Sequence, residues 1–148
     1  MSDIDDIVTQ WEQDAKYDIL HMDNEALRTC RLHSKYLRLL ADYKKKRTQL
    51  KFRSNELKQQ KIRYYSGEMS LEEVKQLNIE QYQGNRLGPT LMAKQLESDP
   101  DLNRIQMQRE AIDMIIETLE SIISIIKSRD FQIKNWKDIQ AFNRGETY

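Results

Sequence analysis

The sequence predicts an all-α fold made of long helices. Its 148 residues include only four glycines and two prolines, so few positions favour turns. Apolar residues recur at helical spacing over long stretches, and we find no strand pattern. Charged residues make up 32% and apolar residues 39%, which suits helices that bury part of their apolar surface against partner chains. We expect one helical domain, 1–148, with N-terminal helices and a loop in 1–97 and a C-terminal helical oligomerisation region in 98–148.

Two helices are predicted in the first half of the chain. The first has one apolar face with 4-3-4 spacing, and three aspartates in its first turn suit the positive end of the helix dipole. Its apolar face is Ile4, Val8, Trp11 and Ala15, and its acids are Asp3, Asp5 and Asp6. The second helix is expected from about residue 24 to residue 65, because glycine and proline are absent there. Its heptad stripe is Tyr36, Leu40, Tyr43, Leu50 and Leu57, with interruptions at Arg47 and Ser54.

Turn and capping residues mark where these helices end. Gly67 is expected to end the second helix as a C-terminal cap. Ser70 and Glu73 fit the S-x-x-E capping box, which predicts a short helix from residue 71 to about residue 77. Residues 81–90 contain two glycines and one proline, so we expect a loop or flexible arm there.

A long apolar helix is predicted in the C-terminal third. Asp99 suits an N-cap, and Pro100 suits the first helical position. A broad apolar face at heptad spacing follows, and such a face needs burial against other helices. It consists of Ile105, Ile112, Ile115, Leu119, Ile122 and Ile126, widened by Ile116 and Ile123. Residues 128–130 are a candidate break before a last apolar segment of Phe131, Ile133, Trp136, Ile139 and Phe142.

The formal net charge of zero conceals a separation of charge along the chain. Residues 1–27 hold eight acids and one base, a net charge of −7. Residues 28–63 hold thirteen bases and two acids, a net charge of +11, and residues 64–148 carry −4. The middle third is therefore a cationic helical rod. Such asymmetry suggests a polyanionic partner, or an acidic segment such as the chain's own N-terminus.

This rod is the main candidate for a binding site. Lysine and arginine neutralise phosphates, and tyrosines beside them can stack on unpaired bases, as single-strand binders do. The cations are Lys44, Lys45, Lys46, Arg47, Lys51 and Arg53, followed by Lys58, Lys61 and Arg63, and the tyrosines are Tyr64 and Tyr65. Two alternatives stay open: the run is only a solvated helix face, or the protein is a structural coiled-coil assembly factor without a DNA role. In the second case the basic face docks on the acidic N-terminus of a neighbour.

The sequence offers little for catalysis, metals or cofactors. Cys30 and His33 have C-x-x-H spacing with His21 upstream, but a zinc site normally needs four ligands and no second pair exists. Glu117 and Glu120 are better explained as a solvated helix face than as acid–base machinery. No phosphate-binding glycine loop or G-x-S-x-G motif occurs. We therefore expect no enzyme, no metal and no cofactor.

Compartment signals favour a soluble intracellular protein. The acidic N-terminus lacks the features of a secretory signal, and the single cysteine excludes an intramolecular disulfide and fits a reducing cytosol. The most apolar run, IDMIIETLESIISII, is interrupted by two glutamates and is too short to span a bilayer. We expect no membrane partner.

Three blocks resemble the UvsY family of recombination mediators from T-even-type bacteriophages. LKQQKIRYYSG, residues 57–67, is similar to the family's basic motif ending in Tyr-Tyr-Ser-Gly. LHSKYL, residues 32–37, is similar to its Leu-x-Ser-Lys-aromatic-Leu stretch. IKSRDFQIKNWKDIQAFNRGE, residues 126–146, resembles its C-terminal ending, with Asp130 in place of a family glycine, which favours a continuous helix. The blocks lie in order and cover about a quarter of the chain.

The resemblance implies a specific function. Such mediators load the phage UvsX-type recombinase onto single-stranded DNA already coated by the phage single-strand-binding protein, and they act as ring-like homo-oligomers, hexamers or heptamers. The cytoplasm of the infected bacterial host is the location it implies. Of the two basic positions tied to DNA binding in the family motif, the nearer falls on Lys61, which keeps the charge, and the farther falls on Gln59, which does not. Lys58 and Arg63 can restore that charge from other helix faces.

Two structural hypotheses follow. At the end of the basic rod, Lys61 and Arg63 take phosphates, while one tyrosine of the pair stacks on DNA or lies at the rim and the other packs inside. The ring contacts are expected on the apolar C-terminal face, and an intrachain bundle with the first helix and the Tyr36–Leu40–Tyr43 stripe is the alternative. The expected oligomerisation residues are Ile112, Ile115, Leu119, Ile122 and Ile126.

Overall fold

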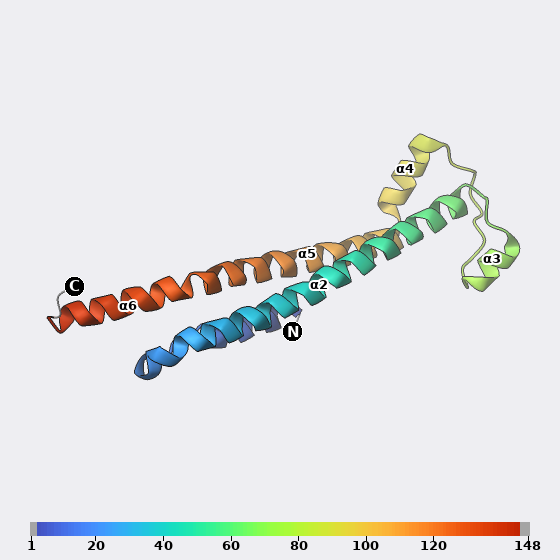
Figure 1. Ribbon diagram of the computed structural model, residues 1–148. Coiled ribbons are helices and arrows are strands. Elements are labelled where there is room, and N and C mark those ends of the chain that lie inside the picture. The colour runs from blue at the N-terminus through green and yellow to red at the C-terminus, as the bar shows by residue number, and fades with distance from the viewer. Residues whose placement is uncertain (1–2, 146–148) are drawn as a thin grey trace. The chain divides into compact units, whose positions relative to one another are not determined.

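The computed structural model describes residues 3–145, and within them the chain is helical and contains no strand, which confirms the predicted class. The elements, in order, are α1 (Asp3–Asp14), the 3-10 turn η1 (Ile19–His21), α2 (Met22–Tyr65), α3 (Leu71–Gln76), α4 (Pro89–Ser98), α5 (Pro100–Lys127) and α6 (Arg129–Asn143). Figure 1 shows these helices in chain order. The 44-residue α2 agrees with the uninterrupted helix predicted from the absence of glycine and proline.

The predicted end of α2 and the predicted start of α3 are confirmed. Gly67 adopts φ 74°, and the backbone N–H groups of Gly67 and Glu68 donate to the carbonyls of Tyr64 and Arg63, which is a Schellman motif. The Ser70 side chain caps α3 by accepting from the Glu73 N–H, as the capping box predicts. Local sequence therefore explains where α2 ends and α3 begins.

One helix in the second half was not predicted. This is α4, although Gly88–Pro89 places proline at its first turn and is a start signal. The C-terminal helix is interrupted at Ser128, which agrees with the candidate break at residues 128–130 and not with the continuous helix that Asp130 favoured, so α5 and α6 are separate elements. The start of α5 was predicted correctly, since the Asp99 carboxylate accepts from the N–H groups of Asp101 and Leu102.

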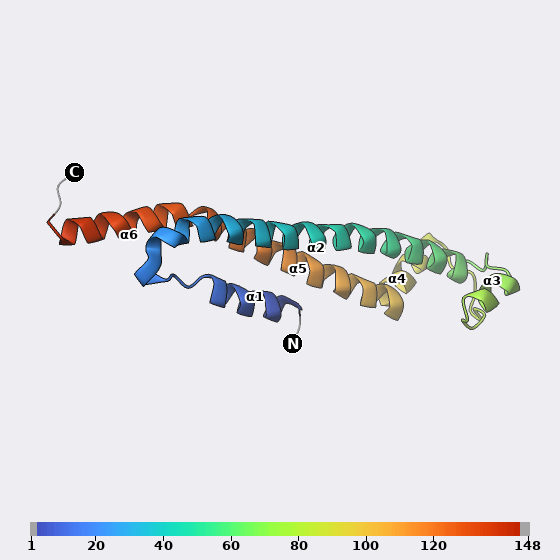
Figure 2. The same ribbon diagram turned by 60° about the horizontal axis from the view of Figure 1, so that its bottom comes forward.

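The chain forms two compact units. Unit 1 contains the residues up to 45 and those from 112 onward, and unit 2 contains residues 46–111. In unit 1, α1 and the C-terminal helices pack on the first half of α2 (Figure 2). The predicted organisation as one domain, with regions 1–97 and 98–148, stays a prediction.

The core of unit 1 corrects the face that was expected between subunits. Four of the five expected oligomerisation residues, Ile115, Leu119, Ile122 and Ile126, are buried within the chain, and Ile112 packs against them. Their partners include Ile7, Tyr36, Leu40 and Tyr43. Side chains buried inside one chain leave no surface for another, so the intrachain bundle, the stated alternative, is what the structure has. On α1, Ile7 is buried and Val8 is 38% exposed, so the predicted face is rotated toward Ile7.

A buried ion pair fixes the start of α6 in unit 1. Arg129 and Glu25 are 1% and 2% exposed, and the Arg129 Nη2 lies 2.5 Å from the Glu25 Oε2. Arg129 also donates to the Thr29 hydroxyl and the Ala15 carbonyl, and its guanidinium lies 4.1 Å from the centroid of the Tyr17 ring. Because a buried charge is costly without partners, this arginine holds three chain segments in register.

Unit 2 has a smaller core around the end of α2. Its buried apolar side chains are Leu50, Tyr65, Val74, Met92 and Ile105, contributed by α2, α3, α4 and α5. The segment between α3 and α4 is a loop, as predicted for residues 81–90, except that α4 already begins at Pro89.

Candidate nucleic-acid interface

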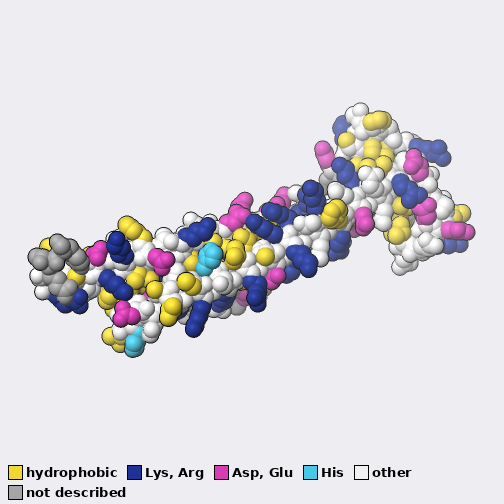
Figure 3. Space-filling view, viewed as in Figure 1, with side chains coloured by type: hydrophobic (Ala, Val, Ile, Leu, Met, Phe, Trp, Pro, Cys, Tyr) yellow, Lys and Arg dark blue, Asp and Glu magenta, His cyan; other side chains and the backbone are white. Residues whose placement is uncertain are grey.

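The predicted cations of α2 differ in how they are used. Eight of the nine are exposed, and seven of these lie before residue 60, namely Lys44, Lys45, Lys46, Arg47, Lys51, Arg53 and Lys58. Figure 3 shows Lys and Arg side chains along this helix. The spacing of Arg47, Lys51 and Lys58 is four and then seven residues, which places them on one side of the helix. This side is the basic stripe.

Lys61 is held in an ion-pair cluster. Its Nζ lies 2.7 Å from the Asp101 Oδ2 and 3.3 Å from the Asp99 Oδ2. Burial opposes the charge on Lys61, but these two carboxylates outweigh it and raise the pKa of Lys61 above its usual range. Phosphate binding at Lys61 therefore requires that these carboxylates give up their cation. No local pattern predicts this competition, because the two aspartates lie about forty residues from Lys61 in the sequence.

Arg63 is also paired. Its Nη2 lies 2.7 Å from the carboxylate of Glu73 on α3, and this pair raises the pKa of Arg63. The side chain is 44% exposed, so the pair lies at the surface. Exposed ion pairs are weak and exchange readily, so Arg63 is available to a phosphate at little cost.

The adjacent tyrosines are separated into one buried and one half-buried ring. Tyr65 is 8% exposed and donates to the Asp99 carboxylate at 2.6 Å, while Tyr64 is half-buried and donates to the Glu80 carbonyl at 2.7 Å. Tyr82 completes a three-ring cluster, with its ring centroid 5.4 Å from that of Tyr64 and 5.3 Å from that of Tyr65. A base that stacks on this cluster therefore meets Tyr64 or Tyr82. Tyr82 was not among the predicted site residues, because its loop carries no helical pattern.

Beside the tyrosines lies a cleft of about 330 Å³. Its walls include Lys61, Tyr64 and Tyr65, together with the carboxylates of Asp99 and Asp101. Burial opposes ionisation of Asp99, but bonds from Tyr65, the Leu102 N–H and Lys61 outweigh it and lower the pKa of the Asp99 carboxyl. Two carboxylates against one lysine make this cleft an unfavourable place for a phosphate.

The acidic N-terminal helix contacts the chain's own basic helix. The Asp14 carboxylate lies 2.5 Å from the Lys35 Nζ and accepts from the Tyr36 hydroxyl at 2.8 Å. Burial opposes this charge, but Lys35, Tyr36 and Gln10 outweigh it and lower the pKa of Asp14. The acids of α1 thus offset the first part of the +11 segment.

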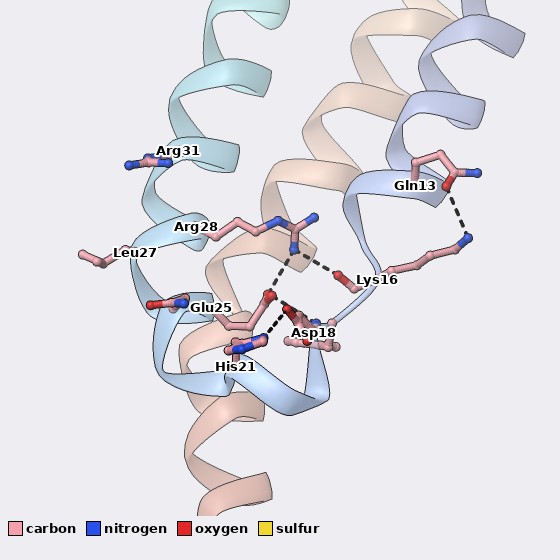
Figure 4. A pocket seen from close by; sticks show the side chains of 10 residues that line it. Gln13, Lys16, Asp18, His21, Glu25, Leu27, Arg28 and Arg31 are labelled. Atoms are coloured by element: carbon pink, nitrogen blue, oxygen red, sulfur yellow. Dashed lines mark hydrogen bonds and ion pairs between the residues drawn. The ribbon is translucent and has the colours of Figure 1, made fainter.

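A cavity of about 590 Å³ near the start of α2 also carries basic side chains (Figure 4). Arg28 donates to the carbonyls of Asp14 and Lys16 and to the Glu25 carboxylate. The His21 Nδ1 lies 2.9 Å from the Asp18 Oδ2. These groups hydrogen-bond within the chain around the start of α2, so few of their donors are available to a ligand.

Among residues 3–145, no group of three or more His, Cys, Asp or Glu side chains is arranged to hold a metal ion. No helix in the same range is both long and apolar enough to cross a membrane.

Comparison with known proteins supports the resemblance found in the sequence. The family model described as "Recombination, repair and ssDNA binding protein UvsY" matches residues 10–146. Recombination protein uvsY of Enterobacteria phage T4 is 22% identical over 143 residues, which cover 97% of this chain and 98% of that protein.

Solved structures show the same fold. The crystal structure of the bacteriophage T4 recombination mediator protein UvsY in lattice type IV has a TM-score of 0.82 at 21% identity, and covers 95% of this chain and 99% of its own. Lattice type II gives a TM-score of 0.81 at 21% identity, with 97% and 99% covered.

These matches bear on the alternatives left open by the sequence. The family is non-enzymatic, in agreement with the expectation that this protein is not an enzyme. Its description includes single-stranded DNA binding, which disagrees with a purely structural assembly factor. Since the family model spans nearly the whole chain, this protein belongs to the UvsY family of recombination, repair and single-stranded-DNA-binding proteins.

Proposed function

We propose that this protein is a recombination mediator: it binds single-stranded DNA and helps to load a UvsX-type phage recombinase onto DNA coated by single-strand-binding protein. The family supports the DNA-binding part, and the T4 relative is itself described as a recombination mediator protein. The recombinase and the single-strand-binding protein are the protein partners of this proposal.

The observation that carries the DNA part is the set of exposed cations on α2. Lys44 through Lys58 place seven positive side chains on a helix surface that single-stranded DNA can follow through its phosphates. Arg63 joins them by exchanging Glu73 for a phosphate, and Lys61 does so only by leaving its two carboxylates. Tyr64 offers its half-buried ring to a base, while Tyr65 supports it from inside.

The proposal includes assembly into a ring-like homo-oligomer, a hexamer or heptamer, through the outer face of α6. Phe131, Ile139 and Phe142 are 67%, 57% and 76% exposed, whereas Ile133 and Ala141 on the same helix are buried in the chain. An unpartnered apolar helix face suits contact with another copy. Linking several DNA-binding helices in one particle raises DNA affinity by avidity, commonly by about 10²–10⁴.

A salt titration tests the DNA part. Binding of a fluorescent oligonucleotide is followed by anisotropy between 50 and 200 mM salt. If about four phosphates are neutralised, the single-strand slope predicts a loss of affinity of roughly 50-fold over this range. Single-stranded DNA is expected to bind more tightly than duplex DNA with weak sequence preference, because stacking needs unpaired bases. Absence of binding at 50 mM salt, or a strong preference for one duplex sequence, contradicts the proposal.

Loading of the recombinase is tested separately. A UvsX-type recombinase is added to single-stranded DNA already coated by the single-strand-binding protein, and its filament formation is followed with and without this protein. We expect the lag before filament growth to shorten. If the protein binds DNA but leaves the lag unchanged, the mediator part fails while the DNA-binding part stands.

A further inference from the structure

A second cavity in unit 2 lies on the side of α2 that carries the basic stripe. It has a volume of about 470 Å³ and is bounded by α2, α4 and the first turns of α5. The side chains that concern its chemistry are Ser54, Asn55, Lys58, Asn103, Gln106 and Arg109. Lys51, Asn55 and Lys58 are spaced by four and three residues, so the stripe continues directly into the cavity wall.

The charge of this cavity suits a phosphate better than the cleft beside the tyrosines does. Lys58 and Arg109 contribute two cations, and Glu97 is the acid in its lining. Among residues 3–145, neither cation lies within ion-pair distance of a carboxylate. In the tyrosine cleft, by contrast, the one lysine already faces two carboxylates. An incoming phosphate therefore displaces no ion pair at Lys58 or Arg109.

Arg109 is positioned for this task by α2 itself. It is half-buried, and its Nη1 donates to the Ser54 hydroxyl at 3.5 Å, a long hydrogen bond. A guanidinium has five N–H donors in a planar fork, so most of its donors are left for a ligand. A half-buried arginine loses less entropy on binding than a fully exposed one, because its rotamers are already restricted.

The neutral lining supplies groups that suit nucleotides of any sequence. Asn55, Asn103 and Gln106 carry amides, each with donors and an acceptor, and Gln106 spends a donor on Glu110 at 3.3 Å. Such groups can bond to sugars and to base edges without selecting one base. A cavity of several hundred Å³ is large enough for a nucleotide-sized group.

We propose that a single strand of DNA crosses this cavity, with a phosphate held between Lys58 of α2 and Arg109 of α5 and the adjoining nucleotide against the amides. This inference rests on the proposed DNA-binding function and adds α5 to the surface that carries it. Arg109 is a DNA contact that the basic motif of α2 does not contain. The strand then follows the basic stripe from Arg47 through Lys51 to Lys58. The tyrosine cluster lies at the edge of this path.

The test compares two arginines of α5 that differ in position but not in charge. Arg109→Gln removes one of the two cavity cations, and Arg104→Gln removes an exposed cation that is paired with Asp101 outside the cavity. Binding of a labelled thymidine oligonucleotide is measured from 50 to 200 mM salt. We expect Arg109→Gln to bind about 5- to 10-fold more weakly at 100 mM salt, with a salt slope shallower by about 0.7. Arg104→Gln should stay within about two-fold of the natural protein, and Arg109→Lys should recover most of the affinity.

A second pair of variants covers the case in which Arg109→Gln lowers the melting temperature. Asn103→Asp adds a carboxylate to the cavity wall, and Gln108→Glu adds one to the same helix outside the cavity. The first is expected to weaken DNA binding several-fold more than the second. If both members of each pair behave alike, the cavity is not a DNA contact, although the proposed function stands. If the natural protein itself does not bind single-stranded DNA, both proposals fail.

Discussion

Single residues show that position on the helix decides the use of each cation. Leu57, Lys61 and Tyr65 are spaced by four residues, so Lys61 lies on the side of α2 that packs within unit 2. There it meets Asp99, which also caps α5 and accepts from the Tyr65 hydroxyl. The lysine that matches the family motif therefore stabilises the junction of α2 with α5, and contact with DNA requires it to exchange partners.

Asp99→Asn is expected to destabilise the folded protein at pH 7. Asparagine keeps the helix cap but loses the charge that faces Lys61 and Tyr65, so we expect a loss of about 1–3 kcal/mol in the free energy of unfolding at pH 7. The pKa of Asp99 is lowered in the folded protein. The Asp99 charge therefore stabilises the protein fully above the pKa of an unfolded aspartate, about 3.9. This stabilisation is lost as the pH falls through the lower pKa of Asp99 in the folded protein.

Urea unfolding at pH 7 and below pH 3 measures this effect. The difference between natural protein and variant should shrink at the acid pH. Asp113→Asn, at an exposed site of α5, serves as the control and should change stability by less than about 0.5 kcal/mol. A difference that stays the same at both pH values contradicts the assignment to the Asp99 charge.

At the scale of elements, helix ends follow local sequence and helix faces follow packing. Gly67 ends α2 because the left-handed conformation at φ 74° costs glycine least. The interruption at Ser128 has a different origin. Arg129 must reach Glu25, Thr29 and Ala15 in the core of unit 1, and no local pattern near residue 128 announces these partners.

Gly67→Ala should weaken the end of α2. An alanine at this φ is strained, and its Cβ lies 3.1 Å from the Nε of the flexible Arg86 side chain, which can move. We expect a loss of about 1–2 kcal/mol in the free energy of unfolding. Gly88→Ala is the matched control, because its φ is −75° and a Cβ there meets nothing within 4 Å. Thermal unfolding by circular dichroism measures both, and equal effects would contradict the role of the left-handed cap.

At the scale of the whole molecule, the apolar residues divide into a face used inside the chain and a face left outside. Leu119 is fully buried among the first helix and α2, while Phe131 on α6 is 67% exposed. Burial against the same chain needs no partner, so the broad isoleucine face says little about assembly. The exposed face of α6 is the surface that we propose for assembly.

Leu119→Asp and Phe131→Asp should therefore differ in effect: the first should impair folding and the second should impair assembly. Leu119→Asp gives up about 1.5–3 kcal/mol of burial and adds an unpaired buried charge, so we expect loss of helicity. Phe131→Asp should keep its helicity, dissociate in sedimentation velocity and lose DNA affinity through the loss of avidity. If Leu119→Asp stays helical and only dissociates, the intrachain core is wrong. If Phe131→Asp leaves the oligomer intact, the outer face of α6 is not the contact.

The helical class, most helix ends and the family follow from the amino-acid sequence alone. Absence of glycine and proline predicted α2, and Gly67, Ser70 and Asp99 predicted ends that depend on residues within one turn. The sequence does not show which apolar face is internal, because a heptad stripe looks the same whether it packs on another helix of the chain or on another copy of the protein. The packing of unit 1 shows that the Ile115–Ile126 face is covered by α1 and α2.

The tertiary structure also determines which charged side chains pair with one another. Lys61 meets Asp99 and Asp101 across about forty residues, Arg129 meets Glu25 across about one hundred, and Arg109 comes to the basic stripe through Ser54. These pairs depend on the position of one helix against another, which sequence spacing does not encode. A cation's exposure and its partners, rather than its presence in a basic run, determine whether it is available for a phosphate.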